Sequence, residues 1–343
     1  MECITIKDVA RVCGVGVSTV SRAINNHPDI NPETKEMIMQ VIKENNYVPN
    51  NSARNLKRSD ARAIAILIKG ISNQFFNSMI KVFEEEIQKK KYSLVLQHVD
   101  AWQDETEVAL ELEKEKRLRG IIFLGGIASH SQDQLKKIPV PFVLSTVSLL
   151  GKEYKNDYSF VSVDDVKQSC RMTEYLISQG HEKIALLCSH KNDVSIGALR
   201  LTGYKKALEA HNIPVDERRI RHMDPELDSY SMESGYRMTK ALLEEGVDCT
   251  AIFAISDSLA IGAVRALIDA GKRVPMDISV AGFDGTEMAA YYNPSITTIR
   301  QPAETMARET IKLLFDSIKK KTNVQQLIFE GELVPGESVK KLN

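Results

Sequence analysis

The sequence lacks two features of secreted or membrane-bound chains, paired cysteines and long apolar runs. Its 343 residues hold five cysteines, which are scattered and never form a C-x-x-C pair: Cys3, Cys13, Cys170, Cys188 and Cys249. This odd set argues against a disulfide framework or a zinc site and favours free thiols in a reducing cytosol. No apolar stretch reaches membrane length, and the N-terminus has no charged-then-apolar signal. We therefore expect a cytoplasmic protein without membrane contact.

The sequence also lacks a strong excess of positive or negative charge. The formal net charge is −1, with a slight basic excess in the first sixty residues and a slight acidic excess in the rest. The charge balance therefore gives no electrostatic sign of a nucleic-acid partner, and any such recognition would have to come from individually placed contacts rather than from a diffuse positive charge. The chain is too long for one ordinary core and suits a small domain joined to a two-lobed body.

Motifs typical of enzymes are absent from the sequence. The seven histidines have no metal-ligand spacing, and no G-x-S-x-G elbow, P-loop or complete G-x-G-x-x-G occurs. Gly125-Gly126 could approach a phosphate, although a simple turn is the plainer interpretation. Asp164-Asp165 could be an acid/base pair, but adjacent side chains usually point apart and these two suit the start of a helix. We expect no catalysis, no cofactor and no metal.

The first 46 residues predict three short helices. Gly14 breaks the first apolar pattern, as a tight turn between two helices requires. A second helix begins at Val17, and Asn31-Pro32 supplies the start of a third. The spacing predicts these inward positions: Ile6, Val9, Ala10, Val12, Cys13, Val20, Ala23, Ile24, Met37, Ile38, Val41 and Ile42. Two helices joined by a glycine turn favour a helix-turn-helix, although a three-helix domain of no special purpose fits the periodicity equally well.

The residue types at these positions are more specific than their periodicity. TIKDVAR-x-x-GV-x-x-STVSRAIN, then a helix, then Y-x-PN-x-x-AR-x-L resembles the lactose and galactose repressor (LacI/GalR) family of bacterial transcriptional regulators. The resemblance implies a helix-turn-helix domain in 1–48 and a hinge helix in 49–60. It also implies a first body lobe in 61–161, to which 300–322 return, and a second lobe in 162–299 with 323–343.

The resemblance assigns base reading to Val17, Ser18 and Arg22, with Arg22 able to bond O6 and N7 of a guanine together. Phosphate contacts are implied for Thr5, Thr19, Ser21, Asn25 and Asn31, and the hinge would contribute Asn50, Ala53, Arg54, Leu56 and Lys57. The hydroxyl side chains could instead cap helices. Gly16 departs from the serine usual in the family, and glycine is still a tolerated N-cap.

The body alternates strands with helices. Apolar runs predict strands at 63–68, 92–99, 120–125, 141–147, 183–189, 250–256 and 278–284. Helical patterns lie at 74–90, 165–179, 198–211, 230–245, 258–270 and 303–320. This alternation predicts parallel α/β sheets, and a break near residue 161 suggests two similar lobes with a ligand cleft between them. The family resemblance identifies this as a periplasmic-binding-protein-like α/β body.

Candidate effector residues lie where strands end. They are Ser72, Asn73, Phe75, Phe76, Thr146, Arg200, Ser256, Asp284 and Gln301. Aromatic faces beside carboxylates and an arginine suit a polyol, and the resemblance places effector contacts at Arg200 and Asp284. The phenylalanines could equally be core. Ser256 stands where many members have Asn, and Thr146 where a lactose-type member has Asp.

We therefore expect a homodimeric repressor that binds palindromic operator DNA under the control of a small sugar-like effector. Apolar helix faces near 74–87 could form the first-lobe dimer contact. Two alternatives remain within regulation, gating by a corepressor such as a nucleobase or by a phosphorylated carrier protein. A cytosolic sugar-binding module is a further alternative, which operator footprinting would separate.

Leu56→Ala is expected to weaken operator binding much more than effector binding, because an apolar side chain there would wedge between base pairs and bend the duplex. A gel-shift titration and a calorimetric titration measure the two affinities. Equal losses in both would contradict the hinge assignment.

Overall fold

The computed structural model describes residues 5–24, 27–45, 62–70, 72–100, 103–126, 132–147, 158–224, 226–320 and 324–342. The chain divides between residues 61 and 62 into two compact units, the head and the body. Among the helices described, none has both the length and the apolarity to cross a membrane.

The head contains the three predicted helices, α1 (Ile6–Val12), α2 (Val17–Ile24) and α3 (Pro32–Glu44). The turn between α1 and α2 passes through Gly14, whose φ of +60° is easily adopted without a Cβ. The small core that joins the helices comprises Val9, Ala10, Val20, Ala23 and Ile38. Two inward positions are wrong, since Val12 is 59% exposed and Met37 is 41% exposed.

The first lobe of the body is built on a parallel sheet of six strands in the order β11-β5-β4-β3-β1-β2. These are β1 (Ala63–Lys69), β2 (Ser93–Val99), β3 (Gly120–Leu124), β4 (Phe142–Ser145), β5 (Phe160–Val163) and β11 (Gln326–Phe329). Alternate residues of β1 enter different cores, Ile64 and Ile66 on one face and Ala65 and Leu67 on the other. Helices therefore cover both faces, as a parallel sheet requires.

The helices of this lobe are α5 (Phe75–Lys89), α6 (Glu105–Lys116), the single turn α7 (Gln132–Leu135) and α13 (Ala303–Ile318). The apolar face of α5 packs with α13 in the core beneath the sheet. Phe75, Phe76, Met79, Val82, Phe83 and Ile87 are all buried there. The apolar face predicted for dimer contact is thus used inside the lobe, because it faces its own sheet and the returning helix.

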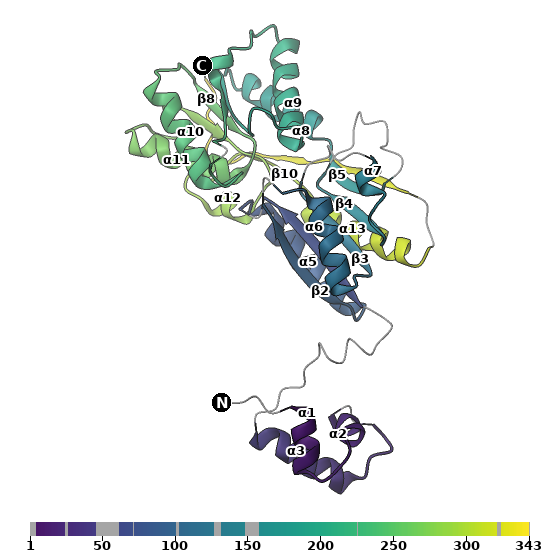
Figure 1. Ribbon diagram of the computed structural model, residues 1–343. Helices are drawn as coiled ribbons and strands as arrows, with labels where there is room; N and C mark the ends of the chain where they lie inside the picture. Colours follow the sequence, from purple (N-terminus) through teal and green to yellow (C-terminus); the bar gives the residue numbers. More distant parts are fainter. Residues whose placement is uncertain are drawn as a thin grey trace. The chain divides into compact units, whose positions relative to one another are not determined.

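The second lobe has a parallel four-stranded sheet in the order β7-β6-β8-β9. Its strands are β6 (Ile184–Cys188), β7 (Ile220–His222), β8 (Ala251–Ala254) and β9 (Ser279–Ala281). Its helices are α8 (Asp165–Ser178), α9 (Ile196–Ala210), α10 (Met232–Glu244), α11 (Asp257–Asp269) and α12 (Glu287–Tyr291), with a 3₁₀ turn at Glu217–Arg219. Figure 1 shows this lobe in green and teal beside the blue strands of the first.

A third, two-stranded sheet pairs β10 (Thr298–Arg300) with β12 (Glu332–Val334) where the chain runs between the lobes. β10 leads directly into α13. The predicted domain boundaries differ from these pairings in two places. Residue 161/162 falls inside β5, and Gln326–Phe329 pairs with β5 in the first-lobe sheet although 323–343 was assigned to the second lobe. The strands that sequence patterns missed are three or four residues long, too short to show a period.

Helix pairs in the second lobe cross at glycines. A Cβ on Gly262 of α11 would lie 2.0 Å from the carbonyl oxygen of Met232, and one on Gly203 of α9 would lie 2.2 Å from that of Val166. These backbones approach more closely than any side chain allows.

Gly262→Ala is expected to lower the free energy of unfolding by about 1–3 kcal/mol, because the new methyl group must push α10 and α11 apart. Urea unfolding measures the change. Lys240→Ala, on the exposed side of α10, is the control, with an effect within about 0.5 kcal/mol. An unchanged midpoint for Gly262→Ala would rule out the close crossing.

Candidate DNA-binding face and interlobe cleft

The second helix of the head exposes the side chains predicted to read bases. Val17 is 41% exposed, and Ser18 and Arg22 are exposed as well. Val20 and Ala23, on the opposite side of α2, are fully buried. Within the described residues Arg22 forms no ion pair, so its guanidinium is available to a partner outside the head.

Two predicted phosphate contacts also cap helices. The Thr5 hydroxyl donates to Asp8 Oδ2 at 2.6 Å in the capping box of α1, and this bond lowers the pKa of Asp8. Asn31 Oδ1 accepts from the backbone N–H of Glu33 at 2.8 Å at the start of α3. Thr19 and Ser21 are half-buried on α2. Asn25 and the hinge residues Asn50, Ala53, Arg54, Leu56 and Lys57 lie outside the described residues.

The cleft of the body is organised around Arg200 on α9, which is 1% exposed. Its Nε donates to Asp165 Oδ1 at 2.8 Å, and its Nη1 lies 3.5 Å from Asp284 Oδ1. Nη1 also donates to the Ile255 carbonyl at 2.5 Å, and the guanidinium stacks 3.7 Å from the Phe283 ring centroid. These partners come from α8, from the end of β8 and from the segment after β9, so the fold and not local sequence assembles them.

Asp284 combines burial, strain and an unused acceptor. It is 2% exposed and has a φ of +118°, a conformation that L side chains rarely adopt. Its Oδ1 accepts from Gln301 Nε2 at 2.8 Å, and the nearby Asn73 side chain also lowers its pKa. Among the described residues no donor meets its Oδ2 in hydrogen-bond geometry. A buried carboxylate oxygen without a donor is costly, which favours an outside hydroxyl as its partner.

Negative charge exceeds positive charge in this cluster. A third buried carboxylate, Asp257, accepts from the Thr298 hydroxyl at 2.6 Å and from the Thr286 N–H at 2.7 Å. Burial raises the pKa of Asp284 to about 7, and Arg200 offsets only part of that rise. Burial likewise raises the pKa of Asp257 to about 6.

Seven of the nine candidate effector residues line one small cavity of about 10 Å³. They are Asn73, Phe75, Phe76, Thr146, Arg200, Asp284 and Gln301, joined by Ser162, Asp165 and Ile196. This volume holds roughly one water molecule. The lobes are therefore closed upon each other at this site.

The eighth candidate, Ser72, lies in a neighbouring cavity of about 350 Å³. Its hydroxyl donates to Asp228 Oδ2 of the second lobe at 3.1 Å, so it joins the two lobes directly. Tyr230 lines the same cavity and has a φ of +61°. Sequence patterns missed Tyr230, because a single aromatic residue ahead of a helix carries no signal.

The ninth candidate, Ser256, is placed differently from the prediction. Its hydroxyl caps α11 by accepting from the Leu259 N–H at 3.3 Å, and it lines neither cavity. The serine is fully buried. It lies between the end of β8 and the start of α11, so its side chain is used by the helix. Asp165, considered only as half of an adjacent acidic pair, is the residue that reaches Arg200.

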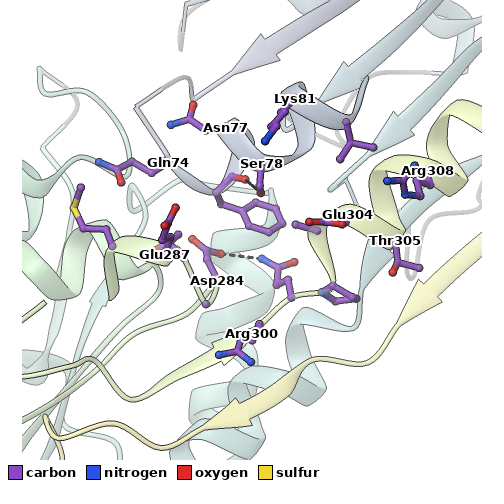
Figure 2. A pocket seen from close by; sticks show the side chains of 18 of the residues that line it. Gln74, Asn77, Ser78, Lys81, Asp284, Glu287, Arg300, Glu304, Thr305 and Arg308 are labelled. Atoms are coloured by element: carbon purple, nitrogen blue, oxygen red, sulfur yellow. Dashed lines mark hydrogen bonds between the residues drawn. The ribbon is translucent and has the colours of Figure 1, made fainter. Parts of the chain in front are cut away.

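Beyond Gln301 the cleft opens into a groove of about 1000 Å³ between α5, α13 and the segment around α12. Figure 2 shows Asp284 and Arg300 on one side and Asn77, Ser78 and Lys81 on the other. All the labelled side chains are polar or charged, while Phe75, Val82, Met288 and Tyr291 add apolar surface to the groove.

Residues 5–50 match the family model described as bacterial regulatory proteins, lacI family, and residues 173–339 match the periplasmic binding protein-like domain. The HTH-type transcriptional regulator MalR of Clostridium butyricum is 42% identical over 339 residues, covering 97% of this chain and 98% of that protein. Catabolite control protein A of Priestia megaterium is 31% identical, covering 93% and 94%.

Two solved structures cover nearly the whole chain. The transcriptional regulator CelR–cellobiose complex has a TM-score of 0.70 and 29% identity, covering 98% of this chain and 99% of that one. The lac repressor dimer bound to operator and the anti-inducer ONPF has a TM-score of 0.74 and 25% identity, covering 99% and 100%.

Asp284→Asn is expected to raise stability, relative to the unsubstituted protein, more at pH 8 than at pH 5. The folded carboxyl has a pKa of about 7 against an ordinary value of 3.8, so between these values the folded state keeps a proton that the unfolded state has released. The unsubstituted protein therefore loses stability as the pH rises through this window, and asparagine removes that loss. Urea midpoints at both pH values measure it, and an equal difference at pH 5 and pH 8 would refute the assignment.

Proposed function

Since the chain belongs to the lacI family of bacterial regulatory proteins and is a DNA-binding transcriptional regulator, we propose that it represses genes of carbohydrate utilisation under the control of a neutral sugar in the interlobe cleft. The observation that carries this proposal is the buried carboxyl group of Asp284, which lines the small cavity beside Arg200 and whose Oδ2 meets no donor in hydrogen-bond geometry among the described residues. A sugar hydroxyl would donate to that oxygen and relieve its burial without a partner.

The other cavity residues suit a sugar as well. Asn73, Thr146 and Gln301 offer amide and hydroxyl groups, while the rings of Phe75 and Phe76 offer apolar faces for the C–H side of a pyranose. The solved structure of the relative CelR, a complex with cellobiose, supports the same ligand class.

Charge favours a neutral ligand over a phosphorylated or acidic one. Arg200 faces Asp165 and Asp284, and Asp257 lies close enough to Asp284 to raise its pKa. The single guanidinium is therefore already paired with carboxyl groups, and an added anion would lack a cation in a poorly solvated site. This argument also disfavours gating by a sugar phosphate in this cleft.

Sugar binding requires the lobes to move, because the inner cavity holds only about 10 Å³. The Ser72–Asp228 hydrogen bond crosses the cleft, and the Asp284–Gln301 bond ties the cluster to the segment that leads into α13. A ligand that changes these contacts shifts the first lobe relative to the second. In a homodimer this shift would alter the spacing of two heads on a palindromic operator, whose half-sites lie about one helical turn apart. The lac repressor dimer on its operator supports this assembly.

The test separates the two ends of the molecule. A duplex selected from random DNA by the full-length protein serves as operator, and fluorescence anisotropy follows binding with glucose, maltose, cellobiose, glucose 6-phosphate or gluconate. Arg22→Ala is expected to weaken operator binding by roughly 5- to 150-fold, the loss of a bidentate guanine contact, without changing sugar affinity. Asp284→Asn is expected to leave operator affinity in place and abolish the sugar response.

A response to the anionic compounds alone would refute the neutral-sugar proposal. A sugar that tightens operator binding would refute induction and favour a corepressor.

A further inference from the structure

At the edge of the first-lobe sheet where β1, β2, β3 and β11 begin, the described residues that lead into these strands carry only basic charges. Short segments lead into this edge from α5 to β2, from α6 to β3 and from α13 toward β11, and one further residue precedes β1. Their charged residues, here called the basic edge, are Arg62, Lys90, Lys91, Arg117, Arg119, Lys319 and Lys320. All seven are exposed, and the described residues of these segments include no Asp or Glu.

The residues of the basic edge are neighbours in space, because parallel strands begin at the same edge of a sheet. The N–H of Ser93 donates to the Arg62 carbonyl at 2.7 Å, and the N–H of Arg119 donates to that of Ala63 at 2.7 Å. Lys90 Nζ lies 5.0 Å from the ring centroid of Phe315 on α13. In Figure 1 the strands of the first lobe begin at the end of that lobe that points away from the second lobe.

In the part of the chain that the structure describes, no acidic side chain neutralises the basic edge. Among the described residues none of its members forms an ion pair. The lysines of the preceding helical turns do pair, Lys89 with Glu86 at 2.9 Å and Lys116 with Glu115 at 2.5 Å.

The second lobe provides an internal comparison. Its corresponding helix-to-strand segments, 179–183, 211–219, 245–250 and 270–278, contain both acidic and basic residues. These pair with each other, as in Arg218–Asp216 at 2.9 Å and Arg273–Asp277 at 2.9 Å. Helix dipoles favour cations at the C-termini of helices in both lobes. The dipole therefore does not explain why only the first lobe has an unpaired basic edge.

Three members of the basic edge also hold a strained backbone. Lys91, Arg117 and Lys320 have φ values of +62°, +51° and +53°. The second lobe ends three of its helices in the same left-handed conformation with glycine, at Gly180, Gly246 and Gly271. Glycine adopts this conformation at lower cost than a residue with a Cβ. At these three positions the first lobe has a basic side chain where glycine would make the folded state more stable. Such a loss of stability is typical of functional surfaces.

We propose that the basic edge binds phosphates of the DNA that flanks the operator while the head holds the operator itself. The segment that joins the head to the body enters the body at Arg62, within this edge. Unpaired Lys and Arg side chains supply what phosphate contacts need, and each contact releases a condensed counterion. This inference rests on DNA binding by the family and is independent of the effector.

The first test replaces the strained residues by glycine. In the full-length protein, Lys91→Gly, Arg117→Gly and Lys320→Gly are combined, and binding is measured to a selected duplex of roughly 20 base pairs and to the same duplex with roughly 10 more on each side. The unsubstituted protein is expected to bind the flanked duplex several-fold tighter. The triple variant is expected to lose this preference, and its salt dependence (log K against log salt) to become shallower by about one per lost contact. Its urea midpoint is expected to rise, so affinity and stability move in opposite directions.

Two further variants separate placed contacts from net charge. Lys90→Gln with Lys319→Gln removes charge from the basic edge without changing a strained position and is expected to reduce the flank preference. Lys206→Gln with Lys272→Gln removes the same charge from exposed positions of the second lobe and is the matched control. Asn212→Gly, at a left-handed position of that lobe, controls for the glycine effect. Equal binding of both duplexes by the unsubstituted protein, or an equal loss in the second-lobe control, would overturn the proposal.

Discussion

The buried guanidinium of Arg200 is the charge on which the arrangement of the body depends. Its hydrogen bonds and ion pairs join Asp165 at the start of α8, the Ile255 carbonyl just after β8 and Asp284 after β9. A buried cation is tolerated only when paired and hydrogen-bonded, so these elements must meet wherever the arginine is buried. The same requirement places more carboxyl groups than cations in the cleft, which supports the proposal that its ligand donates hydroxyl groups.

The cluster is also tied to the first lobe through the backbone. The N–H of Gln301 donates to the Asp284 carbonyl, and the Gln301 side chain donates to the Asp284 carboxylate. Gln301 lies two residues before α13, which packs with α5 against the first-lobe sheet. In the proposed mechanism a ligand at Asp284 would act on α13 and on its sheet, whose opposite edge includes Arg62, the first residue of the body. Packed helices and sheets shift as units, which lets a small change at the cleft reach that edge.

Local signals were enough where function is carried by contiguous residues. The glycine turn, the buried Val20 and Ala23 and the exposed Arg22 follow from the spacing of side chains along helices, a short-range property. Most of the longer strands and helices of the body were equally visible, because four or more apolar residues in a row or at helical spacing leave a pattern. The helix α6 (Glu105–Lys116), which is rich in charged residues, was not among the predicted ones. Patterns failed at β10, β11 and β12, whose residues pair with strands far away in the chain.

The sequence by itself determined the helix-turn-helix head, the alternation of strands and helices and most of the residues that line the inner cavity. Only the tertiary structure decided that Ser256 caps α11, that Asp165 pairs with Arg200 and that Tyr230 and Asp228 reach the cleft. It also decided that seven basic residues, spread over 259 positions of the chain from Arg62 to Lys320, share one edge of a sheet. The physical reason is that periodicity reports which side of an element faces inward, whereas pairing of charges and strands depends on which distant elements the fold brings together.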